Sequence, residues 1–180
     1  VGYLKKLFWD GRATSLEEQM LEPLFSKDEM GNTPENLLNT INEIENYRKL
    51  FAEAYPKRDG DQPIALNEIT KAIAAFQSSL VSLNSKYDQY AHGNDEALNK
   101  NEIEGLNIFR SFVARCAECH TPPLFTNQQF AVIGSPEPDG LPLDPGAEIP
   151  FNDKSLRGAF KVPSLRNIAQ TAPYMHSGRF

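Results

Sequence analysis

The chain has 180 residues, a formal net charge of -6 and an isoelectric point near 5.1. This acidic balance, without a dense basic run, argues against a nucleic-acid surface, and no stretch approaches the roughly 18 apolar residues of a membrane span. The length is sufficient for a buried core, in one domain or two small ones. Because Val1 is not an initiator methionine and no signal peptide is visible, we expect that the chain was processed or trimmed.

Two amphipathic helices are predicted in the first half. Thr33 followed by Pro34 is typical of a helix start, because the hydroxyl can cap the helix and proline has no amide hydrogen to satisfy. Apolar residues then recur every three or four positions, which predicts one helix over residues 34–54. After a turn-rich stretch at 55–63, the same spacing marks a second helix through Ile69, Ala72, Ile73, Phe76, Leu80 and Leu83.

A third helix is predicted before residue 116. Asn99 and Glu102 have the spacing of a capping box, in which each side chain bonds the backbone of the other residue. We expect this helix to lead directly into the cysteine-containing segment. Its apolar stripe consists of Ile103, Leu106, Phe109 and Phe112.

Both cysteines of the chain lie in one CxxCH motif, Cys116 to His120. This spacing is that of c-type haem attachment, because two thiols three residues apart can form thioethers with the two vinyl groups of one haem. His120 is then the proximal ligand of the iron, and axial ligation tunes the iron's potential. The motif therefore predicts a protein that carries electrons.

Other uses of two cysteines fit the pattern less well. A thioredoxin-like redox pair belongs at a strand-to-helix junction, and no alternating strand pattern precedes Cys116. Structural zinc needs four ligands, whereas the three histidines, His92, His120 and His176, are widely spread. An inert buried pair or a structural disulfide would not explain the adjacent histidine.

The segment after Thr121 is rich in proline, with nine of the thirteen prolines between Pro122 and Pro173. Long helices cannot persist there. We interpret it as an ordered wrap, because large apolar residues are interspersed through it and a flat haem would give them a surface to bury against. These residues are Leu124, Phe125, Phe130, Val132, Ile133, Phe151, Phe160, Val162 and Leu165.

Four segments resemble the bacterial di-haem cytochrome c peroxidases and their relatives, in order and spacing, over nearly the whole chain. The resemblance implies an all-α, cytochrome c-like fold with long irregular loops. Residues 1–85 would be the C-terminal part of the peroxidatic haem domain, and residues 86–180 an electron-transfer haem domain incomplete at its C-terminus. The segments are Phe8–Ala13 with Leu16, Gln19 and Pro23; Glu29–Gly31; Gly105–Phe109 with the CxxCH motif; and Phe160–Asn167 followed by Thr171–Gly178.

The resemblance also indicates what a complete family member adds. Such proteins carry two haems, and the first CxxCH lies upstream of the segment that contains Trp9. The methionine that usually ligates the electron-transfer haem lies beyond the position of Phe180. We therefore expect the chain to be part of a longer protein with a second haem c.

Three residues match family positions in catalysis. Trp9 matches the tryptophan that relays electrons between the haems, whereas from composition alone it would be a core tryptophan. Glu29 matches a carboxylate over the open face of the peroxidatic haem, where one group can serve as base and then as acid on peroxide. Gln19 matches an amide that holds peroxide or water there, and Pro23 matches a residue that lines the same pocket. Without the resemblance, Gln19 and Glu29 are typical solvated helix-end residues.

The segment near the C-terminus matches a calcium site. Thr171 and Pro173 match positions whose backbone carbonyls help to bind calcium between the domains, and oxygen ligands suit that ion. A turn is the alternative for this stretch, and the third protein ligand would be an asparagine before Val1. His176 matches a histidine near the electron-transfer haem, but neither it nor Met175 is expected to be the sixth ligand.

Five basic side chains surround the motif and the wrap, and we expect that they either neutralise the haem propionates or form a solvated basic face. Neither alternative changes the expected function. These side chains are Arg115, Lys154, Arg157, Lys161 and Arg166.

For the whole protein, the resemblance implies reduction of hydrogen peroxide to water with electrons from a small donor, a cytochrome c or a copper protein. Covalent haem attachment outside the cytoplasmic membrane indicates the periplasm, and the resemblance allows a homodimer. Two alternatives stay open: a mono-haem electron carrier, and a di-haem relative that oxidises another substrate. A second CxxCH before Val1 would distinguish the peroxidase family from the carrier.

Overall fold

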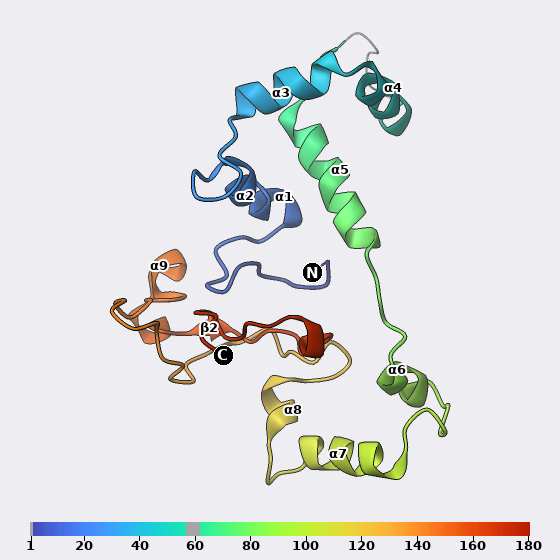
Figure 1. Ribbon diagram of the computed structural model, residues 1–180, viewed down its shortest axis with the longest axis vertical. Helices are drawn as coiled ribbons and strands as arrows, with labels where there is room; N and C mark the ends of the chain where they lie inside the picture. The colour runs from blue at the N-terminus through green and yellow to red at the C-terminus, as the bar shows by residue number, and fades with distance from the viewer. Residues whose placement is uncertain (1, 57–61) are drawn as a thin grey trace. The chain divides into compact units, whose positions relative to one another are not determined.

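The computed structural model describes residues 2–56 and 62–180 and is mostly helical (Figure 1). This agrees with the expected all-α class, and the structure adds one two-stranded antiparallel sheet. The chain forms two compact units. The first unit comprises Val1–Tyr3 and Ala13–Leu80, and the second comprises Leu4–Arg12 and Val81–Phe180. Within the described residues, no helix combines the length and apolar character needed to cross a bilayer.

Two helices of the first unit begin at side-chain caps. The hydroxyl of Ser15 accepts a hydrogen bond from the amide of Glu18, and that of Thr33 accepts one from the amide of Asn36, each over 3.1 Å. These bonds satisfy amides that have no partner inside a helix. The predicted helix start at Thr33 and Pro34 is confirmed. The helices are α1 (Leu16–Gln19), α2 (Leu21–Phe25), α3 (Pro34–Glu43), α4 (Glu45–Ala54) and α5 (Leu66–Ser79).

The prediction of one helix over residues 34–54 is wrong at its centre. The break falls at Ile44, which is extended (φ -85°, ψ 107°) between α3 and α4. The side chain of Asn42 holds this corner, because it donates to the carbonyl of Ile64 over 3.0 Å and accepts from the amide of Ile64 over 2.6 Å. The guanidinium of Arg48 donates to the carbonyl of Asn42, which loses its helical partner at the break.

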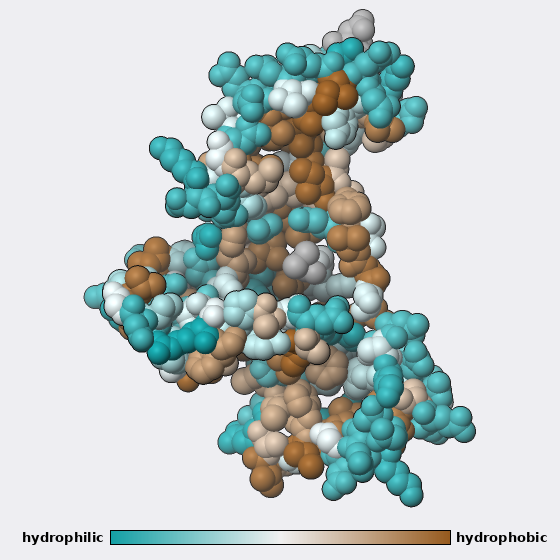
Figure 2. Space-filling view, viewed as in Figure 1, coloured by the Kyte–Doolittle hydropathy of each residue, from teal (hydrophilic) through white to brown (hydrophobic). Residues whose placement is uncertain are grey.

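The core of the first unit lies between α3, α4 and α5, and α1 packs against α5. The helix α5 ends earlier than predicted, so that Leu80 and Leu83 lie beyond it, and the hydroxyl of Ser79 donates to the carbonyl of Phe76 in the last turn. Figure 2 shows apolar side chains along α5 at the surface, where Phe76 is 63% exposed. The turn-rich stretch at 55–63 falls largely on 57–61, outside the described residues. The core comprises Phe51, Ile64 and Ile69, with Leu37, Leu38, Ile41, Tyr55 and Ile73 around them.

The second unit contains shorter helices. The predicted capping box is confirmed, because the amide of Glu102 bonds the side chain of Asn99 and the amide of Asn99 bonds that of Glu102. The third helix stops at Arg110, since the hydroxyl of Ser111 bonds both the carbonyl of Ile108 and the amide of Ala114. The elements are α6 (Lys86–Ala91), α7 (Lys100–Arg110), α8 (Cys116–Cys119), β1 (Phe130–Ala131), α9 (Glu148–Phe151), η1 (Lys154–Leu156), β2 (Phe160–Lys161) and η2 (Ile168–Gln170).

Phe112 was expected in the apolar stripe of this third helix, and that expectation is wrong. It lies in the turn between α7 and α8, and its side chain is 94% exposed. The stripe pattern assumes that the helix continues, whereas the serine turn at residue 111 rotates the next residues away from the helix face. The neighbouring Val113 is 95% exposed for the same reason.

The proline-rich segment, the wrap, contains only short elements, as predicted, and its longest helix is the four-residue α9. β1 and β2 pair antiparallel, with Phe130 opposite Lys161. The ladder continues at one end, because Val162 donates to the carbonyl of Gln129 over 2.9 Å. On the opposite edge of β2, the amide of Lys161 donates to the carbonyl of Trp9 over 2.8 Å. Of the nine apolar residues named for this wrap, only Val162 is buried, at 6% exposed; Val132 and Ile133 are 62% and 68% exposed, and the other six lie between these values.

Candidate haem-attachment site

The CxxCH motif forms the short helix α8 and the residue that follows it. Arg115 enters this helix in the left-handed conformation (φ 57°), which sharply turns the chain after α7. Both thiols are free, with Cys116 half-buried and Cys119 exposed. One helical turn separates the two sulfurs, so both can react with one flat macrocycle.

The end of α8 is capped by the loop that follows it. The hydroxyl of Thr121 donates to the carbonyl of Ala117 over 2.9 Å. The side chain of Asn127 donates to the carbonyl of Glu118 over 3.0 Å, and its backbone amide donates to that of Cys119 over 2.7 Å. These bonds satisfy carbonyls that lack a helical partner. They therefore fix the two cysteines relative to the loop.

The imidazole of His120 is oriented by two backbone carbonyls. Its Nδ1 lies 3.2 Å from the carbonyl oxygens of both Phe125 and Pro163. A nitrogen that faces two acceptors carries the proton, so Nε2 is the nitrogen with a free lone pair. Histidine ligands of metals are held in this way, with the second nitrogen donating to a carbonyl or carboxylate. The free Nε2 could therefore bind a metal ion such as a haem iron.

The two carbonyls are held in turn by the wrap. The hydroxyl of Ser164 donates to the carbonyl of Leu124 over 2.6 Å, and the buried hydroxyl of Thr126 donates to that of Val162, also over 2.6 Å. Each of these bonds joins residues next to an acceptor of the histidine ring. The loop after the motif and the segment after β2 are thus tied together on either side of His120.

An ion pair ties α6 to the same loop. The guanidinium of Arg166 bonds both carboxylate oxygens of Asp88, over 2.7 and 3.0 Å, and also donates to the carbonyl of Pro123. The hydrogen bonds from Arg166 hold the pKa of Asp88 well below its ordinary value, and those to Asp88 raise the pKa of Arg166. The Asp88 side chain is 7% exposed, so solvent screens this pair little.

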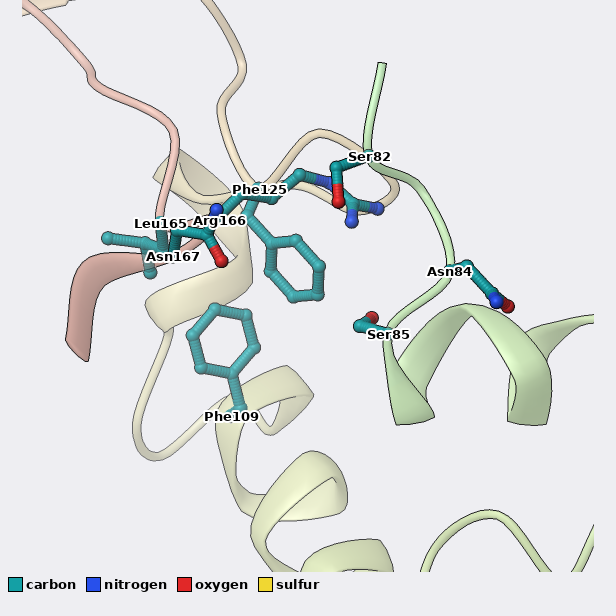
Figure 3. Close-up of a pocket in the computed structure, with 8 residues that line it drawn as sticks. All are labelled: Ser82, Asn84, Ser85, Phe109, Phe125, Leu165, Arg166 and Asn167. Carbon is teal, nitrogen blue, oxygen red and sulfur yellow. The ribbon is translucent and has the colours of Figure 1, made fainter. Parts of the chain in front are cut away.

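A pocket of about 420 Å³ lies beside this ion pair (Figure 3). Figure 3 shows the ring of Phe109, from α7, next to the ring of Phe125, from the loop after α8. The pocket shares a wall with the histidine site, because Phe125 also provides one of the carbonyls that His120 faces. Its lining is Ser82, Asn84, Ser85, Phe109, Phe125, Leu165, Arg166 and Asn167.

We expect Asp88→Asn to lower the free energy of unfolding by about 3–5 kcal/mol, because it leaves a largely buried guanidinium without its counter-charge. The pKa of Asp88 in the folded state is lower than its ordinary value of 3.8. The contribution of the ionised carboxylate to the free energy of unfolding is therefore fully present above pH 3.8 and is lost as the pH falls below that value. The difference between wild type and variant should therefore shrink in acid. Urea denaturation at pH 7 and pH 3 measures both effects.

The exposed Asp95→Asn provides the matched control, and we expect it to change stability by less than about 0.5 kcal/mol. A loss of under about 1 kcal/mol for Asp88→Asn at pH 7 would contradict the structural role assigned to the pair.

The structure places the predicted catalytic residues in different units. Gln19, half-buried, ends α1, and Glu29, exposed, lies in the turn after α2; both belong to the first unit. That turn folds back because Met30 donates to the carbonyl of Pro23 over 3.1 Å. Trp9 belongs to the second unit together with the motif, and its side chain is partly exposed.

The predicted calcium residues are surface residues. Thr171 caps η2, and Thr171 and Pro173 are both exposed. Among the residues that the structure describes, no group of three or more acidic, histidine or cysteine side chains is gathered as a metal site. His176 is engaged elsewhere: its Nε2 lies 2.9 Å from Glu137, and its ring stacks on Phe160. This hydrogen bond lowers the pKa of Glu137.

A sequence model described as di-haem cytochrome c peroxidase matches residues 1–96, more than half of the chain. The chain belongs to this family, and membership implies haem c as the cofactor. The family match includes Trp9, Gln19 and Glu29 and ends before the CxxCH motif.

Individual relatives agree with this assignment. The chain is 38% identical to the methylamine utilization protein MauG of Methylophilus methylotrophus, over 98% of this chain and 51% of that protein. It is 35% identical to the cytochrome c551 peroxidase of Nitrosomonas europaea, over 95% of this chain and 50% of that protein.

Solved structures show the same likeness. A MauG-like protein associated with microbial copper homeostasis aligns with a TM-score of 0.82 and 32% identity, over 98% of this chain and 55% of that one. The diheme peroxidase BthA from Burkholderia thailandensis aligns with a TM-score of 0.79 and 27% identity, over 97% of this chain and 48% of that one. The chain spans about half the length of the relatives that it matches.

Proposed function

We propose that the chain is part of a periplasmic enzyme that reduces hydrogen peroxide to water with electrons from a small cytochrome c or copper protein. Family membership supports the reaction class. The observation that carries the proposal is the orientation of His120, whose Nδ1 faces two carbonyls so that Nε2 is available beside the free thiols of Cys116 and Cys119. Covalent attachment of haem through these thiols supports the periplasmic location.

The residues of the second unit would hold and serve the electron-transfer haem. Haem c, when bound, supplies an iron that accepts and donates single electrons. Cys116 and Cys119 would fix it covalently, and His120 would bind the iron while its carbonyl partners keep the ring from rotating. Trp9 would relay electrons onward; its backbone is fixed to β2 through the amide of Lys161.

Residues of the first unit would bind peroxide and transfer protons to and from it. Glu29 is a candidate acid and base, because peroxide cleavage requires that one oxygen lose a proton and the other gain one. Its carboxylate is exposed on the turn after α2, and no hydrogen bond to another described residue engages it. The amide of Gln19 would orient peroxide or water, beside Pro23.

In the full-length protein, residues 1–85 would complete a peroxidatic domain whose haem motif lies outside this chain, and residues 86–180 would form the electron-transfer domain. The carbonyls of Thr171 and Pro173, which are on an exposed turn, would contribute to a calcium site. Homodimer formation is part of the same proposal.

A second candidate is oxidation of a substrate other than peroxide alone. The observation that favours it is the 38% identity to a protein named for methylamine utilization. Trp9, Gln19 and Glu29 would have the same roles in such an enzyme, with the oxidising equivalents passed to a further substrate.

Haem quantification on the full-length protein tests the proposal, followed by peroxide titration of the reduced form. We expect two covalent haems per chain and rapid reoxidation, with two electrons consumed for each peroxide. One haem per chain, with no fast reaction with peroxide, would instead identify a mono-haem electron carrier. Two haems with an oxidised state that persists after the peroxide is consumed, until a further substrate supplies electrons, would favour the second candidate.

A further inference from the structure

Lys161 is a buried cation in β2. The residue is 7% exposed, and burial lowers the pKa of its ammonium group. Among the described residues, its side chain forms no ion pair, hydrogen bond or contact with an aromatic face. A buried ammonium without a counter-charge is unfavourable, because it loses its hydration and no ion pair or hydrogen bond compensates for that loss.

The other basic side chains around the motif and the wrap do not share this position. Arg115 pairs with Glu118 over 2.8 Å, Arg157 with Glu148 over 3.0 Å and Arg166 with Asp88 over 2.7 Å. Lys154 is exposed and therefore hydrated. Of the five basic side chains, only Lys161 is buried and has no carboxylate partner in the described part of the chain.

The backbone of Lys161 connects two parts of the proposed electron-transfer site. Its amide donates to the carbonyl of Trp9 over 2.8 Å. Two residues further along the chain, the carbonyl of Pro163 faces the Nδ1 of His120 over 3.2 Å. An extended chain rises about 3.3 Å per residue, so the Cα atoms of Lys161 and Pro163 lie within about 7 Å of each other, and the ammonium is carried from there on a stem of four methylenes.

We propose that Lys161 is the counter-charge for a propionate of the haem attached at Cys116, Cys119 and His120. This inference rests on the proposed haem attachment. Propionates are the carboxylates of the cofactor that family membership implies, and an ammonium on a flexible stem can reach such a group as a point charge. Pairing would compensate both buried charges at once, whereas each alone is unfavourable.

The test compares Lys161→Met with wild type in the full-length, haem-loaded protein. Methionine keeps an unbranched side chain of similar length and removes the charge. Haem content is measured first, and the midpoint potential of the His120 haem follows by spectroelectrochemical titration. We expect the equilibrium constant for reduction to fall about tenfold, a potential decrease of about 59 mV, because an uncompensated propionate favours the ferric state.

Two further variants serve as controls for the charge and for its position. Lys161→Arg keeps the charge, so we expect its reduction equilibrium to lie within twofold of the wild-type value. Lys154→Met removes an exposed charge seven positions away and should also change it by less than twofold. Resonance Raman spectra should show a shifted propionate-bending band in Lys161→Met only.

The proposal is overturned if Lys161→Met binds haem and alters the reduction equilibrium less than twofold. It is also overturned if added chloride or phosphate abolishes the difference in potential between wild type and Lys161→Met while their propionate Raman bands are the same. The partner of Lys161 would then be a free anion. If Lys161→Met loses haem, Lys161→Arg decides: a tenfold fall with the charge retained overturns the proposal. Wild-type protein without covalent haem would refute the proposed function instead.

Discussion

Glu29→Gln is expected to slow peroxide cleavage by the full-length enzyme by about 10²–10⁴-fold, which is the range for removal of a general acid–base group. Glutamine preserves the size and polarity of the side chain but can neither accept the proton from the attacking peroxide nor return it to the departing oxygen. Haem content and the potential of the His120 haem should stay at wild-type values. Stopped-flow mixing of the reduced enzyme with peroxide measures the cleavage rate directly.

The matched control is Glu35→Gln, because Glu35 is also exposed and lies six residues further along, in the first turn of α3. We expect it to leave the rate within twofold of wild type. If Glu29→Gln reacted within threefold of wild type, proton transfer would not depend on this carboxylate. The role proposed for Glu29 would then have to pass to another group in the full-length protein.

Replacing both Cys116 and Cys119 with serine is expected to abolish covalent attachment at this motif, so the full-length protein should carry one covalent haem per chain instead of two. A serine hydroxyl cannot add to a vinyl group to form a thioether, so haem would be released on denaturation. Each single variant should retain one thioether and a weaker attachment. Intact-mass measurement of denatured protein, together with absorbance of the separated polypeptide, reports the amount of haem that stays bound.

Thr121→Ala is the control for this experiment. It removes the hydroxyl that caps α8 at Ala117 and leaves both thiols in place, so the covalent haem should be retained. Haem loss in Thr121→Ala as well would mean that the attachment depends on the helix end rather than on the sulfurs. Two covalent haems per chain in the full-length double serine variant would contradict attachment through Cys116 and Cys119.

Local signals in the sequence predicted local structure well. Thr33 and Asn99 begin helices as expected, because a cap depends on residues within one turn. The break at Ile44 could not be predicted in the same way. It depends on hydrogen bonds between Asn42 and Ile64, which are 22 positions apart. Hydrophobic periodicity alone continues through such a corner.

In the candidate site too, the sequence shows some of the groups involved and not others. The spacing of Cys116, Cys119 and His120 is visible in the sequence because the side chains themselves carry the chemistry. The acceptors of the histidine ring are backbone carbonyls, which any residue has, so no side-chain pattern marks Phe125 or Pro163.

The partners of the basic side chains could not be predicted either. Arg166 bonds Asp88, which is 78 positions earlier, and nothing near Asp88 in the sequence indicates that pairing. The burial of Lys161 follows from its place in the ladder between Phe130 and Trp9, and the sequence shows neither pairing.

The second unit is discontinuous in sequence, since Leu4–Arg12 belongs to it although Ala13–Leu80 does not. Limited proteolysis between Leu80 and Val81 would therefore not release it as an independent fragment. The C-terminal product would keep the Leu4–Arg12 segment only while Trp9 stayed docked, and a polypeptide starting at Val81 would lack the carbonyl that the amide of Lys161 bonds. Dissection of this chain into its two units thus requires that Leu4–Arg12 accompany Val81–Phe180.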